Sequence, residues 1–566
     1  MHPLRVTGPN GEVAHLSCRG RGPLARDGAA RGSRRSPKLA PYDHAVPLRS
    51  LLAIAAGLCL WLAQPGPQIW PLALVGVAGL AYATAGVDRL RDGFLLGVLT
   101  GLAAFVPTLK WSGIYVGPMP WLALSASQAV YVGFLGIALA LLQRDGRVRV
   151  LLGAASWVAM EWARSTTPFG GFPWARLAFS QAESPLVHLA SVAGAPGVTF
   201  VVAVIGGALA LAAQRWQARR WGAGLVPVAA AGALVLVSIP WPTPTDGKPL
   251  TVAAIQGNVP APGLDFNAER RAVLDNHAGL TRQVASDAAA GRGPSPDVVF
   301  WPENSSDIDP LRNPDAQQVI TDAVRAAGVP TVVGAVLQEP APNVSNTSLL
   351  YGPDGQLLDR YVKQHPVPFA EYIPYRSFFR MFTDKVDLVR NDFTAGTEST
   401  VFQIPTRSGT VPTAPVICFE VAYDSLVRQP VQDGAQLLLV PTNNATFGYS
   451  DESVQQLAIS KLRAIETGRS VVHISTVGVS ALIRPDGTVT QQSGLFTRDA
   501  LVDDVTLRTE QTLATKVGRI PEVALSVFAA LGMLVAWRSR RASRVPSRAS
   551  RSARPGSDEK EADDRS

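Results

Sequence analysis

Cysteine is scarce in this chain, which has only three among its 566 residues. Cys18 lies in a polar leader, Cys59 in an apolar run and Cys418 in the polar middle of the sequence, so no disulfide framework can form within that middle region. A lone thiol there is as readily a small core residue as a reactive group. The chain also lacks a zinc-type spacing of ligands and a glycine-rich phosphate loop, so we expect no metal and no cofactor.

Long apolar runs are missing from residues 245–515, and this absence predicts a soluble globular domain in that range. Elsewhere the runs are long enough to cross a bilayer, for which a helix needs about 20 predominantly apolar residues. We predict eight spans, at residues 48–64, 69–86, 93–109, 118–142, 149–164, 186–213, 221–240 and 520–537.

These runs divide the chain into five parts. A seven-helix transmembrane region at 48–240 precedes the soluble domain at 245–515, and a final transmembrane helix follows at 520–537. The two ends are a polar basic extension at 1–47 and a tail at 538–566. Neither has enough apolar residues to build a core, so we expect both to be disordered.

Basic residues outnumber acidic ones, 52 against 44, and their placement carries more information than the net charge of +8. They gather at both ends and in short loops between apolar runs, which is typical of membrane topology rather than of a nucleic-acid surface. With the leader in the cytoplasm, every inside loop is basic; these loops carry Arg89 and Arg91, then Arg144, Arg147 and Arg149, then Arg215, Arg219 and Arg220, and finally Arg538, Arg540 and Arg541. The pattern predicts two cytoplasmic termini and an extracytoplasmic soluble domain.

Charged residues are rare within the spans, which argues against a transporter, because transporters usually need polar groups near the middle of the bilayer. Glu161, near the end of the fifth span, is an exception. It is either a functional group or one half of a structural ion pair. Arg164 lies one helical turn further on, and we expect the two to pair at the membrane interface. The aromatic loop at 166–174 predicts either an interfacial belt or the entrance to a lipid site.

Short β-rich runs alternate with helical patterns through the soluble domain. The expected strands lie at 250–255, 298–301, 331–336, 348–351, 416–419, 437–441, 471–474 and 481–484, and the expected helices at 267–289, 315–327 and 452–467. Continuous apolar strands separated by helices indicate an α/β domain whose sheet is covered by helices. Pro-Asp-Gly at 353–355 and at 485–487 predicts two tight turns.

Glu303, Lys363 and Cys418 sit at or just beyond strand-like runs, where functional residues of α/β folds commonly gather. A thiol needs a base to become a thiolate, and its reaction with a carbonyl needs a cation or an N–H group to hold the oxyanion. Glu303 can serve as the base, and Lys363 with the backbone N–H of Phe419 as the oxyanion donors. Each residue alone is more simply a solvated or core side chain. Their order, at intervals of about 60 and 55 residues, is the stronger signal.

Four segments resemble the nitrilase superfamily: Phe-Trp-Pro-Glu at 300–303, Tyr-Val-Lys at 361–363 with Pro-Phe-Ala-Glu-Tyr-Ile-Pro at 368–374, Ile-Cys-Phe-Glu at 417–420, and Thr-Asn-Asn-Ala-Thr-Phe-Gly at 442–448. Soluble nitrilases lack spans. With its spans, the chain from about 48 to 540 resembles the apolipoprotein N-acyltransferase family, a membrane-embedded branch of that superfamily. The resemblance implies an αββα sandwich inserted between transmembrane helices 7 and 8, in the inner membrane of a bacterium.

The resemblance also implies a set of site residues. Glu303, Lys363 and Cys418 would form a catalytic triad, Glu371 would support the lysine, Glu420 would be an acid beside the nucleophile, and Trp241 would face lipid at the exit of span seven. The residue after the cysteine is often Tyr in the family, and Phe419 stands there in this chain. That difference removes a hydroxyl but keeps the backbone oxyanion donor.

The reaction implied by the resemblance is acyl transfer through a thioester. Cys418 would take an acyl chain from a membrane phospholipid, expected to be phosphatidylethanolamine. It would then pass the chain to the α-amino group of the diacylglyceryl-cysteine that begins an apolipoprotein. Both substrates are membrane lipids or lipid-anchored, the enzyme is expected to be a monomer, and no nucleic acid takes part.

Several alternatives stay open at this stage. The domain is alternatively a membrane-tethered amidase that hydrolyses a small amide, or part of a scaffold that only binds a partner. His365 and His473 allow a Cys–His hydrolase in place of the Glu–Lys–Cys arrangement. The aromatic and charged stretch at 375–393 is a candidate lid.

Overall fold

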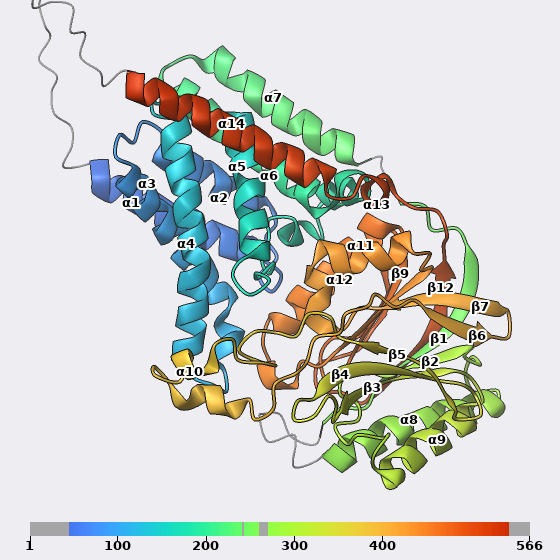
Figure 1. Cartoon of the computed structure of the whole chain (residues 1–566). Coiled ribbons are helices and arrows are strands. Elements are labelled where there is room, and N and C mark those ends of the chain that lie inside the picture. Colours follow the sequence, from blue (N-terminus) through green and yellow to red (C-terminus); the bar gives the residue numbers. More distant parts are fainter. Residues whose placement is uncertain (1–44, 240–242, 260–269, 543–566) are drawn as a thin grey trace, which may run out of the picture. The chain divides into compact units, whose positions relative to one another are not determined.

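The computed structural model describes residues 45–239, 243–259 and 270–542 of the chain (Figure 1). Within these ranges a bundle of helices precedes a β-sandwich, and one further helix returns to the bundle after it. The long helices of the bundle are α1 (Ala45–Ala63), α2 (Pro71–Thr84), α3 (Leu90–Thr108), α4 (Pro118–Leu142), α5 (Val150–Thr166), α6 (Ala190–Gln217), α7 (Trp221–Ser238) and α14 (Ile520–Ala542). Each of them overlaps one of the expected spans.

Not all of these helices are long and apolar enough to cross a membrane by themselves. Within the described ranges, five helical segments qualify by length and composition, namely Leu90–Thr108, Pro118–Leu142, Pro185–Gln217, Trp221–Ser238 and Ile520–Arg541. Pro47–Ala63 and Pro71–Thr84 are apolar but shorter. The expectation of eight spans therefore stays a prediction.

Helices α3 and α4 pack closely because glycines line their contact. Gly93, Gly97 and Gly101 recur every four residues on α3, so they share one face of that helix. A Cβ atom added to Gly97 would lie 2.1 Å from the carbonyl oxygen of Val132 on α4. Small residues at such contacts let helix backbones approach within a membrane bundle. A larger side chain at Gly97 would force the two helices apart.

The soluble domain contains two six-stranded sheets. The first has the order β12-β1-β2-β3-β4-β5, and the second has the order β11-β10-β9-β8-β7-β6. In each sheet three neighbouring strands are parallel, β1, β2 and β3 in the first and β7, β8 and β9 in the second, and the outer strands are antiparallel. The strands span β1 Lys248–Gln256, β2 Val298–Phe300, β3 Thr331–Leu337, β4 Ser345–Tyr351, β5 Leu357–Val362, β6 Phe402–Thr406, β7 Gly409–Pro415, β8 Leu437–Thr442, β9 Ser470–Ser475, β10 Ala481–Ile483, β11 Val489–Gln492 and β12 Asp499–Leu507.

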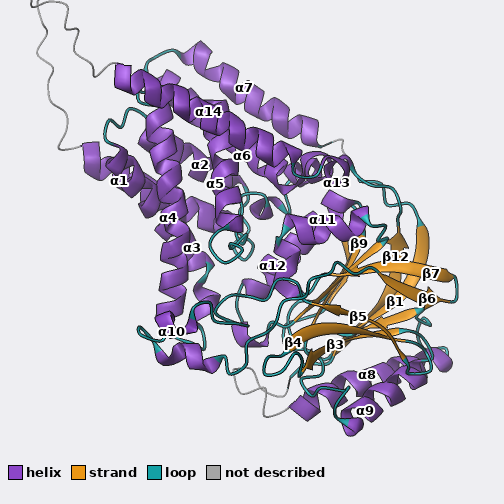
Figure 2. Ribbon diagram, in the orientation of Figure 1, coloured by secondary structure: helices purple, strands orange, loops and turns teal. Residues whose placement is uncertain are grey.

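The two sheets pack face to face between two layers of helices (Figure 2). Apolar side chains of both sheets, such as Val252 and Phe300 from one and Leu439 and Val472 from the other, form one buried core. Helices α8 (Arg270–Ala289) and α9 (Pro314–Ala327) cover the outer face of the first sheet. Helices α11 (Asp424–Gln432) and α12 (Glu452–Thr467) cover the second and also adjoin the bundle. This four-layer arrangement is the expected αββα sandwich.

The elements depart from the expected ranges at several places. The expected strand at 416–419 is instead the end of a loop and a short 3-10 helix, Cys418–Ala422, which follows β7. Helix α1 begins at Ala45, before the expected end of the extension, and α14 continues to Ala542, beyond the expected span. The candidate lid contains the short helix α10 (Arg376–Phe379) and a 3-10 turn at Asp384–Leu388. Cys18, Trp241, the extension up to residue 44 and the tail from residue 543 lie outside the described residues.

The expected pair of Glu161 with Arg164 is also wrong. Glu161 instead accepts hydrogen bonds from the Nε atom of Arg176 at 3.4 Å, the backbone N–H of Leu177 at 2.8 Å and the hydroxyl of Thr199 at 2.7 Å. The guanidinium of Arg164 donates to the backbone carbonyls of residues 172 and 174. The aromatic loop is therefore held against the bundle by the ion pair of Arg176 with Glu161 and by the hydrogen bonds of Arg164 to the backbone of the loop.

Candidate active site

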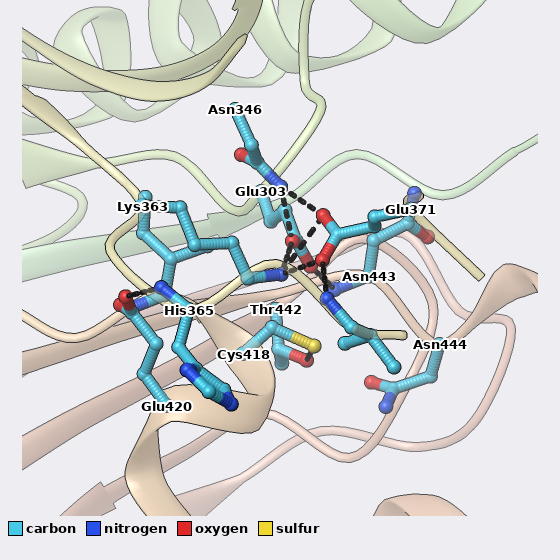
Figure 3. Close-up of polar contacts among 12 residues, drawn as sticks. Glu303, Asn346, Lys363, His365, Glu371, Cys418, Glu420, Thr442, Asn443 and Asn444 are labelled. Atoms are coloured by element: carbon cyan, nitrogen blue, oxygen red, sulfur yellow. Dashed lines mark hydrogen bonds and ion pairs between the residues drawn. The ribbon is translucent and has the colours of Figure 1, made fainter. Parts of the chain in front are cut away.

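The ends of three strands bring Glu303, Lys363 and Cys418 together (Figure 3). Glu303 follows β2, Lys363 directly follows β5, and Cys418 lies three residues beyond β7. The first two come from one sheet and the third from the other, so the site lies where the two sheets meet. Loops converge at the carboxyl ends of parallel strands, which is where α/β folds commonly bind their ligands.

Lys363 is fully buried between two carboxylates. Its Nζ atom lies 3.0 Å from the Oε1 atom of Glu303 and 2.9 Å from the Oε2 atom of Glu371. The side-chain amide of Asn346 donates to both acids, at 2.6 Å to Glu303 and 3.0 Å to Glu371. Burial lowers the pKa of Lys363, but the charges of Glu303, Glu371 and Cys418 outweigh it and hold the pKa well above its ordinary value. Lys363 is therefore a permanent cation inside the site.

Glu303 is held on both of its oxygen atoms. Its Oε1 atom accepts from Lys363 and Asn346, and its Oε2 atom accepts from the backbone N–H of Asn443, at 2.8 Å, in the loop after β8. Asn304, the next residue, has a φ of 55°, in the left-handed region that residues other than glycine seldom adopt. The turn after β2 is thus fixed so that the carboxylate points into the site.

Cys418 also adopts a left-handed backbone conformation, with a φ of 55°. Its sulfur accepts a hydrogen bond from the hydroxyl of Thr442 at 3.3 Å and one from the side-chain amide of Gln456 at 3.5 Å. Burial, followed by the charge of Glu303, raises the pKa of the Cys418 thiol, whereas Lys363 and the Thr442 hydrogen bond lower it. This conformation costs a non-glycine residue conformational free energy, and such strained residues are commonly found at functional sites.

Glu420 joins the loop of the thiol to the loop of the lysine. One of its oxygen atoms accepts from the backbone N–H of Ile417 at 2.7 Å, and the other from those of Gln364 at 2.7 Å and His365 at 3.1 Å. The hydroxyl of Tyr361 donates to both oxygen atoms, at 3.0 and 3.1 Å. Burial raises the pKa of Glu420 to about 7, although Lys363 and these donors oppose the shift. Glu420 thus links the segment that carries Cys418 to the segment that follows Lys363.

Aromatic side chains of the helical region reach the residue next to the thiol. Phe419 stacks against Phe172 and Trp174 of the aromatic loop, with ring centroids 5.6 and 5.7 Å apart. Trp174 also meets Trp111 edge to face at 5.7 Å. The side-chain oxygen of Gln455, on α12, accepts from the indole N–H groups of both tryptophans, at 2.7 and 3.1 Å. The aromatic loop is therefore part of the wall behind Phe419.

The structure thus assembles the residues expected from the sequence, apart from Trp241, which lies outside the described residues. Sequence reasoning did not identify Asn346, Tyr361, Thr442, Gln455 and Gln456 as parts of the site. Asn346 lies in β4, which is buried along its whole length, but it precedes the expected strand at 348–351 and no pattern in the sequence marks it. The rival Cys–His arrangement has no support in the described part of the chain, where the ring of His365 packs on Tyr423 and that of His473 bonds to Ser460.

Comparison with known families covers both parts of the molecule. Residues 56–208 match the apolipoprotein N-acyltransferase N-terminal domain, and residues 251–515 match the carbon-nitrogen hydrolase family. A crystal structure of an amidase from Nesterenkonia sp. is 18% identical and covers 49% of this chain and 96% of the amidase, with a TM-score of 0.34. The fold and the family matches define a nitrilase-type domain joined to a membrane-embedded helical region.

Full-length relatives specify the family further. The apolipoprotein N-acyltransferase of Mycolicibacterium smegmatis is 40% identical over 90% of this chain and 88% of that protein. The apolipoprotein N-acyltransferase of Ralstonia nicotianae is 32% identical over 92% of this chain and 98% of that protein. The chain belongs to the apolipoprotein N-acyltransferase family, and it is an acyltransferase embedded in a membrane. The tethered amidase is not favoured, because relatives named apolipoprotein N-acyltransferase match most of the chain, including the helical region before the sandwich.

Proposed function

We propose that Cys418 is the nucleophile of an acyl transfer, with Glu303 as its base and Lys363 as the cation that stabilises the oxyanion. The observation that carries this proposal is the position of the Lys363 ammonium, which is paired with Glu303 and Glu371 and lowers the pKa of the Cys418 thiol. A fixed cation beside a thiol favours both the thiolate and a developing oxyanion.

The first half of the proposed reaction acylates the thiol. Glu303 takes the proton of the Cys418 thiol, and the thiolate attacks an ester carbonyl of a phospholipid. Lys363 and the backbone N–H of Phe419 stabilise the tetrahedral oxyanion. When that intermediate collapses, the ester C–O bond breaks, Glu303 returns the proton to the departing lysophospholipid oxygen, and a thioester remains on Cys418.

The second half transfers the acyl chain to an amine. The α-amino group of a diacylglyceryl-cysteine attacks the thioester carbonyl, and the same two donors hold the second oxyanion. Glu303 accepts a proton from the amine, the C–S bond breaks, and an amide is formed. The proton then returns to the thiolate, so that the enzyme is restored without a net change in its charge.

The proposed substrates and topology rest on the apolar helices that precede and follow the catalytic domain. We propose phosphatidylethanolamine as the acyl donor and diacylglyceryl apolipoproteins as acceptors, both held in the outer leaflet of the inner membrane by their acyl chains. In this proposal the region 48–240 and the helix 520–537 make eight spans, the domain 245–515 is extracytoplasmic, both termini are cytoplasmic, and the protein is a monomer. The basic loops between the apolar runs support this orientation.

The acyl-enzyme can be observed directly. Purified protein incubated with phosphatidylethanolamine should gain the mass of one acyl chain, and peptide mapping should place that mass on Cys418. Cys418→Ala should not be acylated and should leave diacylated lipoproteins in cells whose only copy carries the change. Triacylated lipoproteins in those cells would refute the proposal.

The lipid donor and the topology have tests of their own. Acylation with phosphatidylethanolamine should exceed that with phosphatidylglycerol of the same chains, and equal rates would remove the head-group assignment. A reporter inserted next to Asp354, in the tight turn between β4 and β5, should report an extracytoplasmic location. A cytoplasmic signal there would overturn the proposed orientation.

A further inference from the structure

We propose that Gln456 is a further catalytic residue, whose side-chain amide donates a hydrogen bond to the Cys418 thiolate; this inference rests on the nucleophilic role of Cys418 proposed above. Gln456 lies on α12 and is completely buried. Its Nε2 atom is 3.5 Å from the Sγ atom of Cys418, within hydrogen-bonding range for sulfur. The residue therefore touches the reacting atom itself.

The hydrogen-bond network fixes which end of the Gln456 amide faces the sulfur. Its Oε1 atom accepts from the hydroxyl of Thr442 at 2.8 Å and from the Nδ2 atom of Asn444 at 3.0 Å. An amide nitrogen at that position could donate to the hydroxyl of Thr442, but it would face the Nδ2 atom of Asn444 donor to donor, with no hydrogen bond between them. The oxygen must therefore point to Thr442 and Asn444, which leaves the N–H group for Cys418.

The orientation of Asn444 is fixed in turn by the chain behind it. The backbone N–H of Gly478 donates to the hydroxyl of Ser475 at 2.7 Å, and that hydroxyl donates to the Oδ1 atom of Asn444 at 2.5 Å. The Nδ2 atom of Asn444 is thereby turned towards Gln456. A series of donors thus runs in one direction from a backbone amide to the sulfur, and bonds in such a series strengthen one another.

The thiolate needs such a donor because its surroundings oppose it. Burial and the charge of Glu303 raise the pKa of the Cys418 thiol, and Lys363 is a cation that opposes them. Lys363 is already shared between two carboxylates. A neutral N–H donor stabilises the negative sulfur without adding a charge that would have to be compensated elsewhere.

Thr442 adds a second contact that can follow the state of the sulfur. Its single hydrogen can be given either to the Oε1 atom of Gln456 or to the Sγ atom of Cys418, since both lie within range of the hydroxyl oxygen. When the thiol is protonated, the hydroxyl of Thr442 can donate to Gln456. When the thiolate forms, the hydroxyl can rotate and donate to the sulfur instead. Gln456 and Thr442 then both donate to the charged form.

The reactivity of Cys418 towards iodoacetamide, followed by peptide mapping of the intact protein in detergent over a range of pH, tests this role. A hydrogen bond to a charged group is worth at least about tenfold in an equilibrium constant. Gln456→Met should therefore slow the alkylation of Cys418 by about tenfold at pH 7.5 and move its pH profile upward by about one unit. Gln456→Glu keeps the shape of the side chain but replaces the donor by an acceptor, and should slow the reaction further.

Two controls separate this effect from a loss of structure. Gln181→Met removes another completely buried glutamine, which lies outside the site and whose amide donates to the hydroxyl of Ser180 at 2.8 Å, and it should leave the alkylation of Cys418 unchanged. Cys59, on α1, serves as an internal reference in every variant. Wild-type alkylation in folded Gln456→Glu would overturn the inference, while acylation of Cys418 by phospholipid in the wild type would still support the proposed function.

Discussion

Trp174 stacks on Phe419 with an angle of 19° between the ring planes. The contact joins a loop of the helical region to the residue that follows Cys418. Because Phe419 supplies a backbone N–H to the proposed oxyanion, its ring must be held still if that donor is to stay in place. The indole N–H of Trp174 is anchored in turn by Gln455 on the sandwich side, so the loop is tied to the domain by two contacts.

Removal of the Trp174 ring should therefore slow acylation more than it weakens lipid binding. We expect Trp174→Ala to lower the rate of acyl-enzyme formation by about tenfold, the effect of a lost aromatic contact together with a hydrogen bond. Trp174→Phe keeps the stack and should lose less. Single-turnover acylation measures both, and Trp221→Ala, at an exposed position at the start of α7, is the matched control. Equal rates for Trp174→Ala and the wild type would exclude the positioning role.

Glu303→Gln should change acylation and alkylation in opposite directions. The substitution removes the proposed base and should lower acyl transfer by at least about a hundredfold. It also removes a negative charge that raises the pKa of the Cys418 thiol, so the thiolate becomes easier to form. Alkylation of Cys418 by iodoacetamide at pH 8 should therefore be faster in the variant, with Glu398→Gln as the exposed control. Slower alkylation would contradict the electrostatic role assigned to Glu303.

Asp424, on α11 of the sandwich, pairs with two buried guanidinium groups, one from the helical region and one from α12. Its carboxylate lies 3.0 Å from Arg176 and 2.7 Å from Arg463. Asp424→Asn leaves both cations without this partner, and removing one member of a buried ion pair costs about 3–5 kcal/mol. Thermal unfolding in detergent should show a clear loss of stability, whereas Asp433→Asn, at an exposed site beyond α11, should not. An unchanged unfolding temperature would show that the ion pairs contribute nothing net.

The same carboxylate sets a dependence on pH. Although burial opposes the shift, Arg176 and Arg463 lower the pKa of Asp424 well below its ordinary value. The unfolded chain binds a proton near pH 4, before the folded protein does, so the stabilisation is present above about pH 4 and is lost as the pH falls further. The difference in unfolding temperature between wild type and Asp424→Asn should therefore shrink on acidification.

Glu452 should show the opposite dependence. Burial raises the pKa of this carboxyl group on α12 to about 8, although a hydrogen bond from Asn444 lowers it. In the unfolded chain a glutamate ionises near pH 4, so the folded protein loses stability as the pH rises from about 4 to about 8, by up to about 1.4 kcal/mol per pH unit. Glu452→Gln removes this loss and should be more stable than the wild type at pH 8 but not at pH 4. Parallel pH profiles of the two proteins would contradict the assignment.

Much of the architecture could be predicted because it depends on local patterns. Apolar runs of bilayer length identified the helices of the bundle, and alternating β-rich and helical segments identified most of the central strands. The edge strands β5, β6, β11 and β12 were missed, since they are partly exposed and lack a continuous apolar pattern. Cys418 was expected inside a strand, but the chain leaves β7 earlier and turns so that the thiol enters the site.

The side chains available for catalysis could be predicted from the order of residues along the chain. The order of Glu303, Lys363 and Cys418, with their neighbouring motifs, was sufficient to predict which side chains would meet, because strand ends in an α/β fold converge. The sequence did not predict the partner of Glu161, the hydrogen bonds of Asn346 to two carboxylates, or the contact of Gln456 with the sulfur. Those depend on which elements pack together, and pairings between residues 15 to 43 positions apart on different elements leave no periodic trace in one sequence. These contacts are set by the folded packing, because a buried polar group must find its partner among the groups that packing brings within hydrogen-bonding distance.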